Sequence, residues 1–459
     1  TLMFAIPGLA GLLLFVYLRP QEIFEPLAGL TFAMATSLVV LGIILDWRLS
    51  ISRPRWSLVM GLSAAFFSWS MLTAVILAPS HLTFIVAISS VAVVMYVVIA
   101  QGVQSFRSLE VTLALVLGIV LVLALVGIHQ GFSPTMCILR SGAGDVGSGD
   151  VVTDGRSCAT VEDCDRDRPD PQAEYWCDHV GLFGTSAVGG RVRYRGILQD
   201  PNEMAWVLSL GIPMAFTFFE RKRSLVRFLL AAGTTVAVMI CVVMTQSRSG
   251  QMSLLVVLGA YFIRRFRWKG ALVGALLALP LLAYGGRSGA EAESSSTERL
   301  ECWQAGIEMW KEMPFTGVGY GNFGEHHSLT AHNSFILTLA ETGPLGLFLF
   351  TALLYAAIKM LAQAVRDFSH KPGAEVAGQW AMALLAGMLG TLVSVFFLSI
   401  AYNAILWVFL GFVAAFYAAV IRHQPRWKIR FGWKDLSVIG VFDFALISAI
   451  AVYIRWKGI

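Results

Sequence analysis

Charged residues are scarce in this chain of 459 residues, in which 34 Lys and Arg and 29 Asp and Glu make up only 14% of the total. Soluble domains carry roughly 25% charged residues, so the composition excludes a soluble enzyme. Hydrophobic residues make up 57% of the chain. At roughly 20 residues per spanning helix, they supply at most about a dozen membrane spans. The sequence therefore predicts a polytopic membrane protein.

The net charge, the N-terminal segment and the cysteine spacing each exclude a further interpretation or leave it unsupported. The net charge of +5 does not imply a nucleic-acid partner, because positive charge in a membrane protein also sets the orientation of its spans. A cleavable signal peptide is not evident, so the first apolar run is expected to be a retained helix. No C-x2-C or Cys/His pairing appears, which argues against a zinc site.

Apolar runs with few charges predict the membrane helices. They lie at about 5–18, 27–45, 57–78, 82–100, 110–130, 203–219, 225–245, 251–263, 269–284, 334–358, 378–398, 402–421 and 436–454. The last run has Asp443 at its middle, and it fits a span, an interfacial helix or a re-entrant segment. The predicted fold class is an all-α polytopic membrane protein with about 12 transmembrane helices, or 13 if the last run spans, and two long outer loops.

The lysine and arginine residues in alternate loops between the predicted membrane helices predict how the chain is oriented in the membrane. One set of connections holds twenty of them, at Arg48, Arg53, Arg55, Arg107, Arg221, Lys222, Arg223, Arg227, Arg264, Arg265, Arg267, Lys269, Lys359, Arg366, Lys371, Arg422, Arg426, Lys428, Arg430 and Lys434. This set is predicted to be cytoplasmic, as is the amino terminus. The predicted organisation is membrane helices at 1–130, an outer loop at 131–202, central helices at 203–284, a second outer loop at 285–333 and C-terminal helices at 334–459.

Arginine dominates the positive charge of the outer set. Its members are Arg19, Arg140, Arg156, Arg166, Arg168, Arg191, Arg193, Arg195, Arg248, Arg287, Arg299 and Lys311. Because the guanidinium fork matches phosphate and carboxylate geometry, this bias indicates anion recognition. The alternative is pairing with the acids of the first outer loop, and we favour it for the arginines from Arg140 to Arg168.

Four of the six cysteines, Cys137, Cys158, Cys164 and Cys177, lie in the first outer loop, and they predict two disulfides with three possible pairings. The acids Asp163, Asp165, Asp167 and Glu174 have the spacing of calcium-loop positions 1, 3, 5 and 12. Arg168 stands where such a loop needs glycine, so a solvated acidic turn is the favoured interpretation. The loop resembles a stapled lid or docking element.

Two polar segments border apolar runs on the outer side. Asp200, Pro201 and Glu203 form a helix start, and Asn202 lies between them. Arg195, just before it, is placed to bind an anion at the helix N-terminus. The turn at 245–250 carries Ser247 and Arg248 and either cradles a phosphate or lets the arginine snorkel, and we favour the phosphate.

The second outer loop contains further candidates. Residues 295–298, Ser-Ser-Thr-Glu, match a capping box that opens an amphipathic helix with Arg299 in its first turn, where a cation implies an anionic partner. The stripe Leu300, Trp303, Ile307 and Trp310 indicates packing or an interfacial anchor rather than a ligand site. The glycine-rich run at 317–324, which includes Tyr320, is a weak nucleotide motif because no strand is expected before it.

His332 and Asn333 stand at the outer mouth of the next helix. Histidine there is suited to act as a general base, and the alternative is a histidine that only caps the loop. Farther along, Gly343-Pro344 is expected to break or kink the helix, and Glu341 at membrane depth needs a partner.

Together, Gly317-Val318-Gly319-Tyr320-Gly321-Asn322-Phe323, His332-Asn333-Ser334-Phe335 and Leu339-Ala340-Glu341-Thr342-Gly343-Pro344-Leu345-Gly346 resemble the signature of the O-antigen ligase and polymerase superfamily. Asp200-Pro201-Asn202 and Ser247-Arg248-Ser249 resemble its two other recurring elements. The resemblance covers about 195 to 350, and the number and spacing of spans agree over most of the chain.

The resemblance implies a metal-independent, inverting glycosyltransferase of a bacterial inner membrane, without cofactors, that takes a glycan from undecaprenyl diphosphate at a periplasmic site. By position, it makes His332 the general base and makes Arg248 and Arg299 the groups that bind the diphosphate. Arg195, Asp200, Asn202, Ser247, Tyr320 and Asn333 are the predicted substrate contacts. The cysteine-rich loop departs from the family pattern and puts the acceptor in doubt.

The acceptor is a glycan chain for a polymerase, the lipid A core for a ligase, or a protein hydroxyl for an O-oligosaccharyltransferase. These activities share donor chemistry, so the motifs do not separate them. A polysaccharide transporter or flippase also suits a dozen spans. The sequence disfavours it because the predicted spans carry few charges and show no evident internal repeat.

Overall fold

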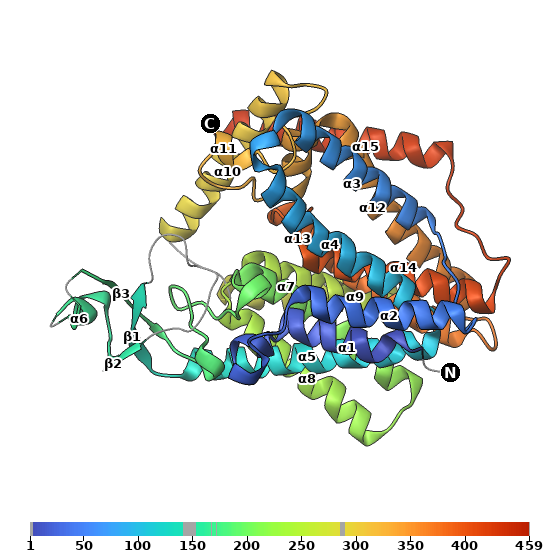
Figure 1. Ribbon diagram of the computed structural model, residues 1–459, viewed down its shortest axis with the longest axis horizontal. Helices are drawn as coiled ribbons and strands as arrows, with labels where there is room; N and C mark the ends of the chain where they lie inside the picture. The colour runs from blue at the N-terminus through green and yellow to red at the C-terminus, as the bar shows by residue number, and fades with distance from the viewer. Residues whose placement is uncertain (1–2, 141–152, 167, 171, 285–289, 459) are drawn as a thin grey trace. The chain divides into compact units, whose positions relative to one another are not determined.

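A computed structural model describes residues 3–140, 153–166, 168–170, 172–284 and 290–458. Within these residues, eight helices are long and apolar enough to cross a membrane. They are α3 (Leu58–Leu77), α4 (Leu82–Gly102, with the turn before it), α5 (Phe106–Phe132), α8 (Leu225–Met244), α12 (Ser334–Phe368), α13 (Glu375–Phe397), α14 (Ala404–His423) and α15 (Trp433–Lys457). The predicted all-α membrane fold is confirmed, and the last apolar run is a full-length candidate span (Figure 1).

The other predicted runs are helices too, but they fall short of the length or hydropathy of a span. α1 (Ala5–Tyr17) and α2 (Phe32–Arg48) have 13 and 17 residues. α7 (Pro201–Arg221) has charged residues at both ends. The runs predicted at 251–263 and 269–284 form one helix, α9 (Arg248–Tyr284), which is interrupted by a non-helical residue at Arg267. The count of 12 or 13 spans therefore stays a prediction.

The chain divides into two compact units. The first unit consists of Thr1–Met3, Ile43–Leu109 and Arg287–Ile459, and the second of Phe4–Gly42 and Glu110–Gly286. In the first unit, α12 packs against α3, α13, α15 and α10 (Ala290–Glu312), while α14 packs along α4. In the second unit, α7 packs between α8 and α9.

Small residues allow close helix packing in the second unit. A Cβ added at Gly8 would meet the backbone of α2 near Val39, and one added at Gly42 would meet the backbone of α1 near Ala5. At Gly211 of α7 it would meet the side chain of Val120 of α5. Such contacts are typical of helices that associate in lipid, where van der Waals packing replaces the hydrophobic drive of water.

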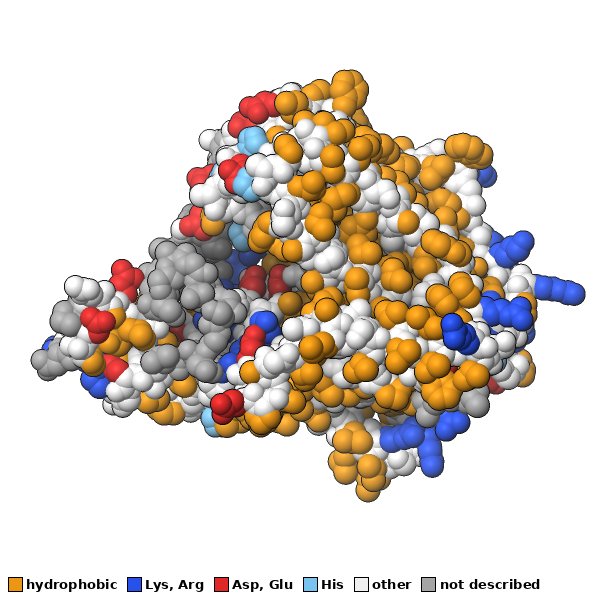
Figure 2. Space-filling model, in the orientation of Figure 1, with side chains coloured by type: hydrophobic (Ala, Val, Ile, Leu, Met, Phe, Trp, Pro, Cys, Tyr) orange, Lys and Arg blue, Asp and Glu red, His pale blue; other side chains and the backbone are white. Residues whose placement is uncertain are grey.

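Hydrophobic side chains also cover the outer faces of the candidate spans, as Figure 2 shows in orange. Leu225 and Val226 of α8 and Val441 and Phe444 of α15 are each at least two-thirds exposed. Apolar surface of this extent is unfavourable in water. It fits a lipid-facing surface and supports the membrane assignment.

The first outer loop contains a small sheet that the sequence did not predict. Strands β1 (Thr135–Arg140), β2 (Thr153–Ser157) and β3 (Glu174–His179) are antiparallel in the order β2-β1-β3, and a short helix α6 (Val161–Asp165) lies between β2 and β3 in the chain. The hydrophobic core of this subdomain consists of the buried residues Cys137, Cys158, Cys164 and Tyr175. Because its apolar core is so small, the subdomain depends on covalent links.

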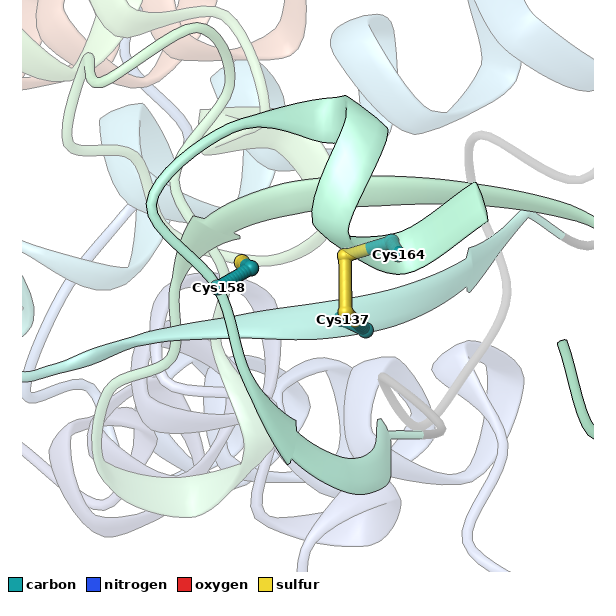
Figure 3. Close-up of side chains that lie close together, drawn as sticks. All are labelled: Cys137, Cys158 and Cys164. Carbon is teal, nitrogen blue, oxygen red and sulfur yellow. A yellow bond between two sulfur atoms is a disulfide. The ribbon is translucent and has the colours of Figure 1, made fainter. Parts of the chain in front are cut away.

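Two disulfides supply these links, as predicted. Cys137 of β1 bonds to Cys164 of α6, and Cys158 bonds to Cys177 of β3. Three of the sulfur atoms lie within 4.8 Å of one another, an arrangement that resembles a metal-binding cluster (Figure 3). Since all four thiols are used in disulfides, this cluster has no thiolate left for a metal.

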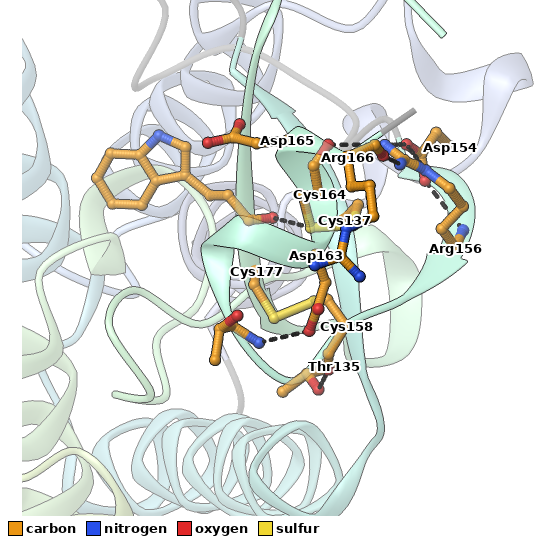
Figure 4. Close-up of a disulfide and its surroundings, with 12 residues drawn as sticks. Thr135, Cys137, Asp154, Arg156, Cys158, Asp163, Cys164, Asp165, Arg166 and Cys177 are labelled. Carbon is orange, nitrogen blue, oxygen red and sulfur yellow. Dashed lines mark hydrogen bonds and ion pairs between the residues drawn. A yellow bond between two sulfur atoms is a disulfide. The ribbon is translucent and has the colours of Figure 1, made fainter. Parts of the chain in front are cut away.

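The acidic run near the disulfides is a helix start (Figure 4). The Asp163 carboxylate accepts the amides of Ala159 and Thr160 at 2.8 and 3.0 Å, and these bonds hold its pKa below the ordinary value. Asp165 pairs with Arg168 at 2.5 Å, and Arg156 pairs with Asp154 at 2.6 Å. The predicted pairing is thus confirmed for Arg156 and Arg168, and the calcium-loop alternative loses two of its carboxylates. Asp167, Arg287 and the side chains of Arg140 and Ser295 lie outside the described residues.

The predicted capping box at 295–298 is wrong. Helix α10 begins at least as early as Ala290, so this segment lies inside the helix, where Ser294 Oγ donates to Glu298 Oε1 at 3.2 Å. The preceding Ala-Glu-Ala-Glu has high helix propensity and extends the helix backward. Arg299 consequently lies nine residues after Ala290, beyond the reach of the helix dipole, and the dipole argument for an anion at this residue fails.

Removing the disulfides should unfold the small sheet. Pairwise replacement of Cys137 and Cys164, or of Cys158 and Cys177, by serine is expected to destabilise the subdomain by about 3–4 kcal/mol, given loops of 27 and 19 residues. Faster proteolysis within 135–179 would show this. Replacing the free, buried Cys241 by serine is the matched control. Peptide mapping that finds Cys137 bonded to Cys158 or to Cys177 would contradict the structure.

Candidate functional site

In the second unit, the predicted helix start at 200–203 is confirmed. Asp200 caps α7, and its Oδ1 accepts the backbone amide of Asn202 at 2.8 Å and the side-chain amide of Asn202 at 2.7 Å. The Asn202 Oδ1 in turn accepts Arg191 Nη2 at 3.1 Å. Arg191 Nε also donates to the carbonyl of Thr245 at 3.0 Å. This network joins the start of α7 to the turn between α8 and α9.

That turn carries Ser247 and Arg248. The Ser247 hydroxyl is buried and accepts the Gly250 amide at 3.0 Å, so it caps α9. Gly250 is required because a Cβ there would collide with the Cβ of Ala205 on α7. Arg248 is the first residue of α9, and its side chain is exposed. The serine therefore shapes the turn, while the arginine lies on its exposed surface.

Arg193 and Arg195 of the first outer loop bind backbone carbonyls. Arg195 is 8% exposed and donates to the carbonyl of Phe183, with a longer contact of 3.5 Å to Glu22. Arg193 Nε donates to the carbonyl of Ser186 at 3.1 Å, and burial lowers its pKa against the opposing effect of Asp178. The geometry gives Arg195 a structural role, in place of the open anion site expected at the start of α7.

In the first unit, α12 is broken where the sequence predicted it. Gly343 has φ +67 and ψ −172, outside the helical region. Pro344 has no N–H to donate to the carbonyl of Ala340, four residues back. Buried backbone carbonyls need partners, especially at membrane depth. The break must therefore be capped by another segment of the chain.

The glycine-rich segment at 317–324 supplies the cap. Val318 N donates to the carbonyl of Ala340 at 2.8 Å, and Gly319 N donates to that of Glu341 at 3.0 Å. The backbone approaches so closely because Gly317 and Gly319 have φ values of +64 and +100, which favour glycine. The motif is therefore a cap for a broken helix, which explains its glycines without a nucleotide.

Two side chains complete this junction. Trp69 of α3 donates its indole N–H to the carbonyl of Thr342 at 2.8 Å. The Glu341 carboxylate is 3% exposed, and its Oε1 accepts the Phe323 amide at 3.2 Å. The predicted partner of Glu341 is thus the backbone of the glycine-rich segment. Local sequence gave no signal for Trp69, since it lies 273 residues from Thr342.

His332 and Asn333 stand at the start of α12. Asn333 Oδ1 accepts the amides of Phe335 and Ile336 at 2.9 and 3.1 Å and so caps the helix. Ser334 Oγ donates to the carbonyl of Leu398 at 2.6 Å and fixes this end of the helix to the link before α14. His332 is half-buried, and its φ of +50 is uncommon for a residue with a Cβ. Strained backbone of this kind persists only where its surroundings impose it.

Arg299 lies on α10 of the same unit, and its side chain is half-buried. The neighbouring stripe packs as predicted, with Leu300, Trp303 and Ile307 all buried. The Trp303 ring meets Phe396 of α13 at 5.6 Å between centroids. This packing fixes the helix that carries Arg299. Each unit thus holds part of the predicted set: Arg195, Asp200, Asn202, Ser247 and Arg248 in the second, and Arg299, Tyr320, His332 and Asn333 in the first.

Comparison with known proteins gives one family model and one relative that match parts of the chain. Residues 233–351 match the model of the O-antigen ligase family, and this stretch contains Arg248, Arg299 and His332. The chain is also 27% identical over 227 residues to the exopolysaccharide production protein ExoQ of Rhizobium meliloti (strain 1021). That match takes in 40% of the chain and 52% of the relative, so the chain spans about half the length of the relative. Both matches agree with the resemblance to the O-antigen ligase and polymerase superfamily. The matched family model describes O-antigen ligases, and the name of the relative describes exopolysaccharide production.

Proposed function

We propose that this protein transfers or polymerises a glycan from an undecaprenyl-diphosphate carrier at the periplasmic face of a bacterial inner membrane. The observation that carries the proposal is the placement of His332. Its ring stands at the mouth of α12 on a left-handed residue between two buried neighbours, Ala331 and Asn333. A histidine held against backbone strain at a helix mouth is better explained by chemistry than by capping, because Asn333 already caps the helix.

In the proposed reaction, one imidazole nitrogen of His332 takes the proton from a hydroxyl of the acceptor. The hydroxyl oxygen attacks the anomeric carbon of the donor sugar as the bond from that carbon to the phosphate oxygen breaks. The electron pair leaves with the lipid diphosphate, and attack from the opposite face inverts the anomeric configuration. General base catalysis of this kind contributes about 10²–10⁴-fold to a rate.

The departing diphosphate carries negative charge that needs stabilisation. We assign this role to Arg248 and Arg299, since fixed cations stabilise such charge without a metal. Arg248 supports the assignment by its exposed position at the N-terminus of α9, where the helix dipole also favours an anion. The acceptor is a glycan, the lipid A core or a protein hydroxyl. The name of the relative, an exopolysaccharide production protein, favours a glycan.

The arginine assignment is tested in a deletion strain that carries variants of the protein. Arg248→Ala and Arg299→Ala are each expected to lower glycan transfer by about 10²–10³-fold, the usual effect of losing one group that stabilises a developing charge. Lysine at either residue should restore only part of the activity, because it cannot bind the diphosphate with two parallel hydrogen bonds. Lipid-linked and surface glycans of each strain provide the measurement.

The same strain separates the alternatives. Single repeat units left on the carrier indicate a polymerase, and full-length chains on the carrier indicate a ligase. Arg168→Ala is the matched control, since Arg168 pairs with Asp165 on the small sheet subdomain. Transfer by the purified protein should also continue in EDTA. Activity that requires an added divalent metal ion would contradict the assignment of charge stabilisation to the arginines.

A further inference from the structure

The first unit contains a pocket of about 260 Å³ that none of the proposed catalytic residues lines. Its walls come from the start of α4, the loop at 320–330, α12 and the link before α14. Phe84, Ile85, Tyr320, Leu337, Glu341 and Tyr402 are among the lining residues. Two of the segments border His332 in the chain, since Thr330 also lines the pocket and Leu337 lies in the first turns of α12.

Glu341 contributes to this pocket a carboxylate oxygen that accepts no hydrogen bond of normal geometry from the described part of the chain. The backbone amides of Phe323 and Gly321 both face its carboxylate, and Oε1 accepts the Phe323 amide, whereas Oε2 is buried and makes no hydrogen bond of normal geometry to a described residue. A buried carboxylate oxygen left unpaired is costly, by about 1–3 kcal/mol or more. Anchoring the glycine-rich segment therefore accounts for one oxygen of Glu341 and leaves the other to a ligand.

Tyr402 adds a second polar group to the lining. Its ring packs against Tyr320 with centroids 4.0 Å apart, and its buried hydroxyl, which lies near the Ser70 and Thr342 hydroxyls, makes no hydrogen bond of normal geometry within the described part of the chain. The neighbouring hydroxyl of Thr342 donates instead to the carbonyl of Thr338 at 2.6 Å. The Tyr320 hydroxyl, in contrast, is paired with Ser89 Oγ at 2.8 Å. The pocket thus combines two aromatic rings, an acceptor and a group that both donates and accepts.

We infer that this pocket binds one sugar ring of the glycan, with ring hydroxyls paired to Glu341 Oε2 and to the Tyr402 hydroxyl. The inference rests on the proposed function and names a subsite for its substrate. The apolar C–H face of a sugar would lie against Tyr320, Tyr402 and Phe84, whose side chain is 67% exposed and stands at the rim. Because pockets that enclose drug-sized ligands measure roughly 300–1,000 Å³, this smaller volume suits a single ring.

Other ligand classes fit the lining less well. A lipid chain would leave both buried polar groups unpaired, which costs free energy. A phosphate would meet the Glu341 carboxylate with like charge. A metal ion would find one carboxylate oxygen and one phenol, which is fewer oxygens than Mg²⁺ or Ca²⁺ takes. A sugar ring, in contrast, supplies hydroxyl donors at its edge and an apolar face for the rings.

The full chain in lipid nanodiscs tests the inference without a transfer reaction. Binding of D-glucose, D-galactose and N-acetylglucosamine is measured by saturation-transfer NMR, with affinities from titration. Glu341→Gln keeps an oxygen for the Phe323 amide and replaces the unpaired one by an amide donor. We expect it to weaken binding of the preferred sugar by about 10- to 100-fold, the effect of losing a hydrogen bond to a charged group. Tyr402→Phe should weaken it by about 3- to 10-fold.

Tyr96→Phe is the matched control, because it removes another buried tyrosine hydroxyl without a partner in the described residues, from a side chain outside the pocket. Its binding should equal that of the parent. The inference is overturned if no sugar binds the parent, or if Tyr402→Phe and a folded Glu341→Gln both bind as the parent does. Should Glu341→Gln fail to fold, Tyr402→Phe decides alone. Sugar binding without any transfer would instead count against the proposed function.

Discussion

Replacing His332 by glycine is expected to reduce glycan transfer by about 10²–10⁴-fold while the protein stays folded. The loss equals the usual contribution of a general base. Glycine is the informative substitution because the residue has φ +50. Most side chains pay roughly 1–2 kcal/mol in this left-handed region, whereas glycine adopts it freely. Transfer is measured with purified protein and lipid-linked donor, and thermal denaturation of the same samples measures stability.

His332→Ala should lose the same activity. It should also be less stable than the glycine variant, because alanine, like histidine, is strained in the left-handed region and lacks the contacts of the imidazole ring. Added imidazole is expected to restore part of the rate in the glycine variant, which a purely structural role would not allow. His326→Ala is the matched control, as His326 is an exposed histidine in the same loop. Full transfer by the glycine variant would disprove the base assignment.

Gly343→Ala should be among the most destabilising substitutions in the chain. The residue has φ +67, and a Cβ there would collide with the carbonyl oxygen of Phe315 and crowd Thr316. The left-handed strain and the collision together are expected to cost about 2–5 kcal/mol. The segment that caps the broken helix would have to move, and the carbonyls of Ala340 and Glu341 would lose their donors. A lower midpoint of thermal denaturation is the expected measurement.

Gly61→Ala provides the comparison for this prediction. Gly61 lies in α3 of the same unit, and no atom stands within 4 Å of a Cβ added there. Alanine in a helix is favoured over glycine by up to about 1 kcal/mol, so this variant should be as stable as the parent or slightly more so. If the two variants were equally stable, the capped break would not be the structural requirement that its geometry indicates.

Local chemistry explains the predictions that succeeded. Asp200 before Pro201 is sufficient for a helix cap, and Gly343 before Pro344 is sufficient for a helix break, because both act within one helical turn. The disulfides followed from four cysteines in one loop, but their pairing depended on the fold of β1, α6 and β3. The capping box at 295–298 failed because helix propensity upstream of it outweighed the local motif.

By itself, the sequence determined the membrane class, the positions of most helices and the presence of the histidine and arginine motifs, since all of these depend on residues close together in the chain. Only the tertiary structure decided which polar groups are already paired. Arg195 is bound to backbone carbonyls, and Glu341 accepts the Phe323 amide through one oxygen while its other oxygen makes no hydrogen bond of normal geometry within the described residues. The partners of Arg195 and Glu341 lie at least 12 residues away in the chain, so no local sequence pattern predicts them. Burial makes each unpaired polar group costly, and for that reason the few that remain unpaired point to ligands.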